Sequence, residues 1–133
     1  MTAFTFLVVD DEPGIRRVLS RALTRIGHSV LLATTGEEAC QVLESSRVDV
    51  VMMDLRMPSM SGQTLYHVIA SRWPDLVGRV VVMSGDPEAT DHESWLGLHD
   101  LPVLPKPFDI AQLVDLVTRF TESPRREANG PQR

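Results

Sequence analysis

Five polar side chains in this sequence stand at the ends of four short apolar runs, and their types suit phosphate chemistry. They are Asp10, Asp11, Asp54, Ser84 and Lys106. Carboxylates held together repel each other, by about 4 kcal/mol for a pair 4 Å apart at an effective dielectric near 20. A hard divalent cation removes that cost, and Mg²⁺ is normally held by one or two carboxylates, waters and a phosphate. If these side chains meet, they predict a Mg²⁺ site whose remaining ligand is a phosphoryl group.

Asp54 is the candidate nucleophile of such a site. It ends the Val/Met-rich run 49–54, which has the length of a strand and suits one that is covered on both faces. A carboxylate can form an aspartyl phosphate with a phosphoryl donor. The Lys106 amine and the Ser84 hydroxyl would contact the transferred oxygens.

A parallel sheet would bring these side chains together. Strand-like runs occur at 4–9, 28–33, 49–54, 78–83 and 101–104, and helical patterns occur at 13–26, 36–46, 61–73, 87–99 and 109–122. This alternation predicts a doubly wound α/β fold, with a five-stranded parallel sheet and five helices. The carboxyl ends of parallel strands share one edge, where ligands bind. Without that convergence, capping of the first helix would be an equally good interpretation of Asp10 and Asp11.

The last third of the chain carries weaker signals. Segment 87–99 has few apolar residues and contains Gly97, so we expect a short or mobile helix in which Trp95 serves as an anchor or a partner contact. The last helix is apolar over more than the usual stripe. Either a core-edge effect or a dimer or partner surface over 87–122 explains it. We expect a domain over 1–122 and a disordered tail or linker start over 123–133.

Composition narrows the class of protein. A chain of 133 residues fits one domain, and its net charge of -5 argues against direct nucleic-acid binding. The sequence has no apolar stretch long enough for a membrane span and no signal-peptide pattern, so we expect a cytoplasmic protein. The single cysteine, Cys40, cannot form an intrachain disulfide and is expected to pack in the core. The four histidines show no ligand spacing and are interpreted as surface or packing residues.

Four short motifs, in this order along the chain, carry a resemblance to a known family. They are Val8-Val9-Asp10-Asp11-Glu12, Asp54-Leu55-Arg56-Met57-Pro58 with Gly62 behind it, Met83-Ser84-Gly85 and Lys106-Pro107-Phe108. Over residues 4–122 the sequence resembles the response-regulator receiver domains of two-component signalling.

The resemblance implies a fold, a reaction and a ligand set. The strand order would be 2-1-3-4-5, and Asp54 would accept phosphate from a histidine kinase or a histidine phosphotransfer protein. Mg²⁺ would be held by Asp11, Asp54 and the backbone carbonyl of Arg56, with Asp10 assisting through water. The Lys106-Pro107 bond would be cis. Such a domain is a switch and not an enzyme, whether it stands alone or belongs to a hybrid kinase or longer regulator.

One departure from the family pattern and one pair of opposite charges lead to two hypotheses. Receivers commonly carry an aromatic residue where this sequence has Val103, whose β-branched side chain has little rotamer freedom. We therefore expect the signal to pass through displacement of Ser84 and through segment 87–99. The opposite charges of Arg56 and Asp86 are predicted to meet over the crevice and hinder the water that hydrolyses the acyl phosphate.

Other classes of function compete with the receiver interpretation. An aspartate-nucleophile, Mg²⁺-dependent phosphohydrolase also uses a strand-end Asp, but it typically carries a second Asp where this sequence has Arg56. The sequence also offers no room for its substrate elements, nor for an output domain after the last helix. A degenerate receiver acting only as a scaffold would not need the complete acidic set.

Overall fold

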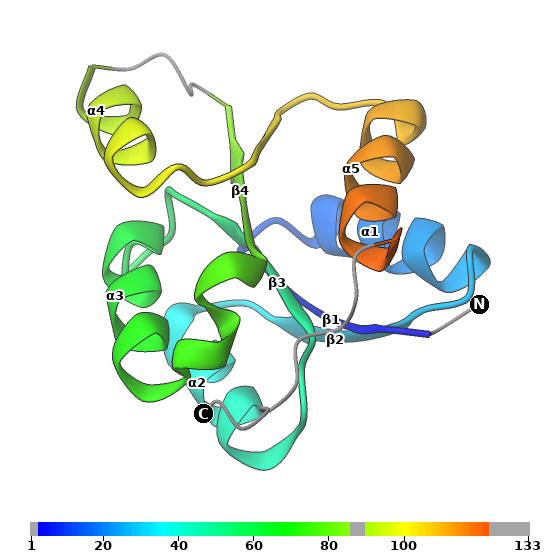
Figure 1. Cartoon of the computed structure of the whole chain (residues 1–133), viewed down its shortest axis with the longest axis horizontal. Coiled ribbons are helices and arrows are strands. Elements are labelled where there is room, and N and C mark those ends of the chain that lie inside the picture. The colour runs from blue at the N-terminus through cyan, green and yellow to red at the C-terminus, as the bar shows by residue number, and fades with distance from the viewer. Residues whose placement is uncertain (1–2, 86–89, 123–133) are drawn as a thin grey trace.

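The computed structural model describes residues 3–85 and 90–122, with side chains described for 3–85 and 94–122. The elements alternate along the chain as predicted (Figure 1). In chain order they are β1 (Thr5–Val9), α1 (Pro13–Arg25), β2 (Ser29–Ala33), α2 (Gly36–Ser45), β3 (Val50–Asp54), α3 (Gly62–Arg72), the 3-10 helix η1 (Pro74–Arg79), β4 (Val80–Ser84), α4 (Thr90–His99), β5 (Val103–Pro105) and α5 (Ile110–Glu122).

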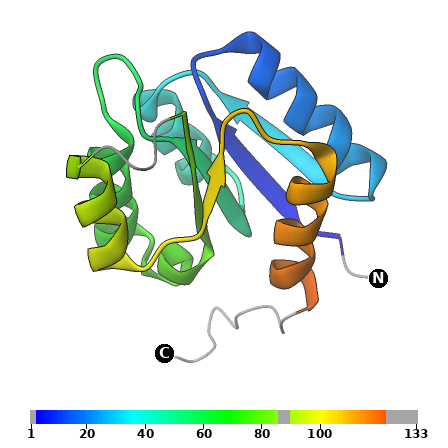
Figure 2. The same ribbon diagram turned by 90° about the horizontal axis from the view of Figure 1, so that it is seen from above.

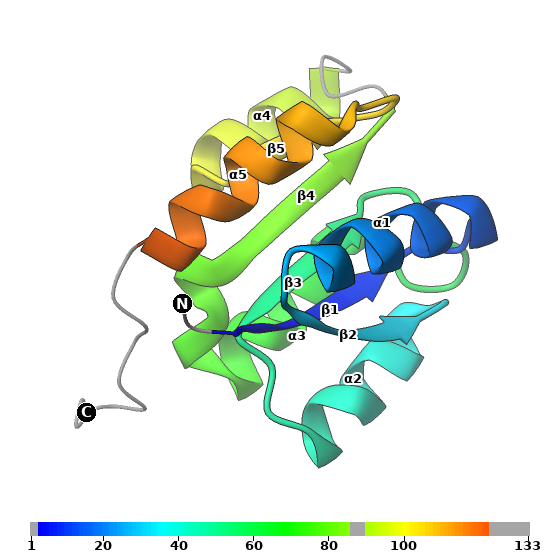
Figure 3. The same ribbon diagram turned by 90° about the vertical axis from the view of Figure 1, so that its right-hand side faces the viewer.

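The five strands form one parallel sheet in the order β2-β1-β3-β4-β5, which confirms the predicted doubly wound fold. Helices α1 and α5 cover one face, and α2, α3 and α4 cover the other (Figure 1). Seen from the side in Figure 3, α1 and α5 lie in front of the sheet. The order places β1, β3 and β4 inside the sheet, so their carboxyl ends meet at one protected edge.

Strand β3 is buried along its whole length, as its unbroken apolar run predicted. Alternate side chains enter opposite cores because successive Cβ atoms point to opposite faces of a strand. Val51 and Met53 pack in the core under α2, α3 and α4. Val50 and Met52 pack in the core under α1 and α5. The Asp54 carboxylate is therefore carried by a strand that is packed on both faces.

Side chains fix the starts of the helices that flank the strand ends. Asp109 is the N-cap of α5: its Oδ1 accepts from the Gln112 N–H at 2.8 Å, and the Gln112 side chain accepts from the Asp109 N–H at 2.9 Å. The Ser61 hydroxyl accepts from the Thr64 N–H at 3.2 Å and caps α3.

Several boundaries differ from the sequence prediction. The predicted strand 78–83 begins only at Val80, because Pro74 ends α3 and starts the 3-10 turn η1, which takes up residues 74–79. The structure therefore adds a sixth, short helix to the five that were expected. The last strand is shorter than predicted and begins at Val103. A regular helix forms at α4 despite its weak pattern.

Some predictions lie outside the described residues. They concern the tail 123–133 and the Asp86 partner of the proposed gate. Among the residues that the structure describes, none of the helices has the length and apolar character needed to cross a bilayer.

Candidate functional site

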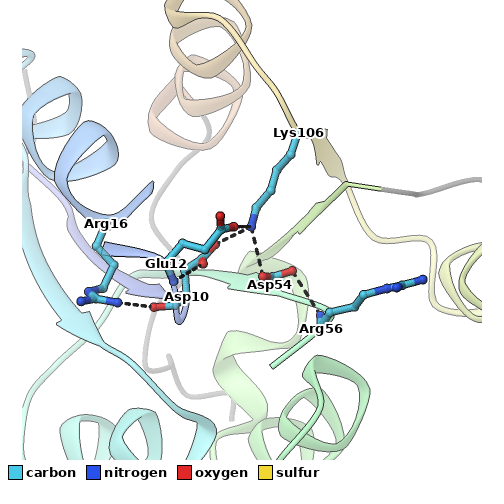
Figure 4. Close-up of polar contacts among 6 residues, drawn as sticks. All are labelled: Asp10, Glu12, Arg16, Asp54, Arg56 and Lys106. Atoms are coloured by element: carbon cyan, nitrogen blue, oxygen red, sulfur yellow. Dashed lines mark hydrogen bonds and ion pairs between the residues drawn. The ribbon is translucent and has the colours of Figure 1, made fainter. Parts of the chain in front are cut away.

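Four strand ends deliver polar side chains to one edge of the sheet. Asp54 and Ser84 are the last residues of β3 and β4. Asp10 and Lys106 directly follow β1 and β5. The Lys106 N–H donates to the Ser84 carbonyl at 2.7 Å, which ties the last two strand ends together. The convergence expected from a parallel sheet is therefore present (Figure 4).

The Lys106 ammonium lies among three carboxylates. Its Nζ is 2.8 Å from Asp10 Oδ2, 3.0 Å from Glu12 Oε1 and 3.0 Å from Asp54 Oδ2 (Figure 4). Burial alone would lower the pKa of Lys106, but the close contacts with the carboxylates of Asp10, Glu12 and Asp54 outweigh burial and raise it. The amine is therefore a permanent positive charge at the centre of this acidic cluster.

The Asp54 carboxylate is buried, with 6% of the residue exposed. Its Oδ2 faces Lys106, and its Oδ1 accepts from the Arg56 N–H at 3.2 Å. Burial raises the pKa of Asp54, although the hydrogen bonds from Lys106 and from the Arg56 backbone act in the opposite direction. Its charged form is thus only partly compensated by the protein, and a cation at the site would stabilise it.

Asp10 is completely buried and only partly satisfied. Its Oδ1 accepts from the Glu12 N–H at 2.9 Å, and its backbone carbonyl accepts from Arg16 Nη1 at 2.8 Å. Its Oδ2 forms the ion pair with Lys106 but lacks a partner in hydrogen-bonding geometry. A buried carboxylate oxygen in this state has room for a further electrostatic partner.

The donor set fits a hard cation. Carboxylate oxygens of Asp10, Glu12 and Asp54 lie within 4.8 Å of one another. Oxygen ligands of this kind are what Mg²⁺ prefers. These acids form the acidic cluster at the strand ends.

Asp11, which was expected to bind the metal directly, is not one of the three acids of this cluster. Its side chain is exposed and lines an open cleft of about 550 Å³, shared with Arg56, Met57 and Pro58. Glu12, to which no role was assigned from the sequence, contacts Lys106. Its position next to the acidic pair was the available signal, since the same turn carries all three acids.

The remaining predicted site residues are placed as follows. Ser84 is buried, with 2% exposed, and Val103 is half-buried and packs against the core under α3 and α4. The Arg56 side chain is exposed and points away from Lys106 in Figure 4. The Lys106-Pro107 peptide bond is cis, as the resemblance implied.

Backbone packing behind Asp54 depends on a glycine. The Gly62 N–H donates to the Leu55 carbonyl at 3.0 Å. A Cβ atom at Gly62 would lie 2.8 Å from Leu55 Cα and would also overlap the Asp54 carbonyl oxygen. Only glycine allows the start of α3 to approach the end of β3 this closely.

Comparisons with known proteins agree with this geometry. The family model of the response regulator receiver domain matches residues 6–118. The DNA-binding transcriptional regulator NtrC of Salmonella typhimurium is 38% identical over 131 residues, which cover 93% of this chain and 28% of that protein. The response regulator MprA of Mycolicibacterium vanbaalenii is 33% identical over 108 residues, which cover 81% of this chain and 46% of that protein. The chain thus spans about a quarter to a half of the length of these relatives.

Solved structures share the fold over most of the chain. The response regulator TrrA of Thermotoga maritima, in complex with Mg²⁺ and BeF, is 28% identical with a TM-score of 0.76, covering 88% of this chain and 98% of that one. The chemotaxis response regulator CheY4 of Vibrio cholerae is 24% identical with a TM-score of 0.80, covering 90% and 99%, and supports the fold alone. Sequence and fold together show that this chain belongs to the response regulator receiver domains of two-component signalling.

Proposed function

We propose that this receiver domain is a phosphorylation switch whose acceptor is Asp54. The donor is a phosphohistidine on a histidine kinase or a histidine phosphotransfer protein. The observation that carries the proposal is the position of Lys106 Nζ, which lies 3.0 Å from Asp54 Oδ2 and 2.8 Å from Asp10 Oδ2. A fixed positive charge at the acceptor oxygen suits a reaction that brings a phosphoryl anion there.

The proposed reaction transfers a phosphoryl group from the donor histidine to Asp54. An Asp54 carboxylate oxygen attacks phosphorus while the phosphorus–nitrogen bond of the donor breaks, and the donor imidazole keeps the electron pair. The product is an acyl phosphate on Asp54. Lys106 would then pair with a phosphoryl oxygen, and the Ser84 hydroxyl would donate to another. Hydrolysis by water returns the free carboxylate, so the domain undergoes a slow cycle without a substrate of its own.

Mg²⁺ is the cation that we propose for the acidic cluster. Asp11, Asp54 and the Arg56 backbone carbonyl would hold it, with Asp10 assisting through water. Glu12 is a further candidate, because its carboxylate lies with those of Asp10 and Asp54. When bound, the ion supplies charge neutralisation at the phosphoryl oxygens. Lys106 would have to exchange carboxylate partners as the ion enters, because it contacts all three acids without it.

Output is proposed to occur by protein contact. Val103 offers no aromatic ring for a rotamer switch, so the movement of Ser84 toward the phosphoryl group would pass to α4 and the α5 side of the domain. The NtrC relatives are named as DNA-binding regulators and are about four times as long as the matched region. In such a protein this domain would control an output domain and would not itself contact DNA, as its net charge of -5 suggests.

Intact-mass measurement after exposure to a small phosphodonor tests this function. With Mg²⁺, the wild type should gain one phosphate, while Asp54→Asn and a chelated sample should gain none. Uptake by Asp54→Asn equal to that of the wild type would refute the assignment. Multiple turnover of an unrelated phosphomonoester would instead favour a phosphohydrolase.

A further inference from the structure

A cluster of aromatic rings fills the space between α3 and α4, away from the acidic cluster. Its members are Tyr66 and His67 from α3 and Trp95 and His99 from α4. These two helices are neighbours on the same face of the sheet in both Figure 1 and Figure 2. The sequence shows no ligand spacing among the histidines, because the two imidazoles come from segments 32 residues apart.

The two imidazoles are close enough to share a metal ion. Their ring centroids are 5.3 Å apart and their planes are inclined by 73°. A Zn²⁺–nitrogen bond is about 2.0–2.1 Å long, and the ring centre lies about 1.1 Å further on. Two imidazoles on one tetrahedral ion therefore hold their centroids about 5 Å apart. The separation of His67 and His99 agrees with that value.

Both residues of the pair are at least partly exposed to solvent. His67 is exposed and His99 is half-buried, while Tyr66, with 5% exposed, closes the cluster from beneath. His67 Nε2 accepts a hydrogen bond from Trp95 Nε1 at 3.5 Å, so its lone pair is directed into the cluster. A hydrogen bond of this length is weak. A metal ion that binds the same lone pair would therefore displace it.

We propose that His67 and His99 form a two-imidazole site for a divalent transition ion, such as Zn²⁺, Ni²⁺ or Cu²⁺, which links α4 to α3. Imidazole nitrogen selects these ions, whereas Mg²⁺ requires oxygen ligands. Among the residues whose side chains the structure describes, no third His, Cys, Asp or Glu joins the pair at ligand distance. Water would complete the coordination, so the site would be weaker than a four-ligand structural zinc site.

The site would act on α4 and would be independent of phosphate transfer. A bound ion would fix the helix whose movement the proposed switch requires, and it would do so without occupying the acidic cluster. Metal binding by His67 and His99 does not require phosphorylation of Asp54.

Isothermal titration of the full, tag-free chain with Zn²⁺, in the presence of excess Mg²⁺, tests the proposal. The wild type should bind one ion per chain. His67→Gln and His99→Gln should each weaken binding by about tenfold or more, the loss expected when one ligand is removed. Asp54→Asn and Trp95→Phe keep both imidazoles and should bind as tightly as the wild type or, for Trp95→Phe, more tightly. Melting without metal establishes that each variant is folded.

Several results would contradict the proposed site. They are saturable Zn²⁺ binding by both histidine variants with wild-type affinity, loss of binding in Asp54→Asn, and the absence of saturable binding by the wild type. Half an ion per chain with a doubling of molecular mass would also contradict it, because the ion would then join two molecules.

Discussion

Replacement of Gly62 by alanine tests how tightly the backbone around Asp54 is packed. The added Cβ would lie 2.8 Å from Leu55 Cα and 3.1 Å from the Asp54 carbonyl carbon. These are backbone atoms, which cannot rotate away as a flexible side chain would. Either the start of α3 or the end of β3 must therefore shift.

The size of the effect follows from three contributions. Overpacking of this kind costs about 1–3 kcal/mol. Loss of the Gly62 N–H to Leu55 carbonyl hydrogen bond costs about 1 kcal/mol more. The reduced freedom of the unfolded chain returns about 0.4–1 kcal/mol. Together these contributions lead us to expect that Gly62→Ala lowers the free energy of unfolding by about 1–3.5 kcal/mol.

Urea unfolding measures this change, and Gly97→Ala provides a matched control. A Cβ at Gly97 in α4 meets nothing within 4 Å, so this substitution should stabilise the domain by about 0.5–1 kcal/mol. Because the shift at residue 62 displaces the Asp54 backbone, phosphate uptake by Gly62→Ala should also be slower than by Gly97→Ala. If Gly62→Ala is as stable as the control, the close approach of α3 to the end of β3 does not require glycine at position 62.

Three further predictions concern the charges and the buried histidine. His28 is buried, and its Nδ1 accepts from the Phe4 N–H at 3.0 Å. Burial lowers the pKa of His28, so the unfolded chain binds more protons just below the unfolded value of 6.5 and stability should fall as the pH drops below it. Urea midpoints from pH 7.5 down to 5 should show this slope in the wild type and a shallower one in His28→Asn; equal slopes would remove His28 as the cause. Lys106→Met removes a cation that contacts three carboxylates, so calorimetric titration should show Mg²⁺ bound about tenfold more tightly or better, and unchanged affinity would contradict the competition. Glu12→Gln should change the unfolding free energy by less than about 1 kcal/mol, because the Glu12 side chain is 61% exposed, and a larger loss in urea would show that this ion pair is structural.

Much of the fold could be predicted because this sequence carries its topology in local patterns. The unbroken apolar run before Asp54 indicated a strand buried on both faces, and β3 is buried on both. Parallel strands then place Asp10, Asp54 and Lys106 at one edge of the sheet. The convergence of these residues follows from the topology and not from any local sequence pattern.

Other features depend on geometry that sequence spacing does not contain. Which acid of the first loop turns toward Lys106 depends on the backbone after β1, and Glu12 takes the place while Asp11 faces solvent. The 3-10 turn at 74–79 shortened the predicted fourth strand, because Pro74 favours a new turn over an extended chain. The approach of His67 to His99 arises only when α4 packs beside α3.

Locating the phosphate on the chain is the most direct test of the proposed switch. Borohydride reduces an acyl phosphate on aspartate to homoserine, and peptide mapping by mass spectrometry then identifies the residue. After treatment with a small phosphodonor and Mg²⁺, we expect homoserine at position 54 alone. Modification at position 10 or 11, or none at 54 in a sample that has gained phosphate, would contradict it.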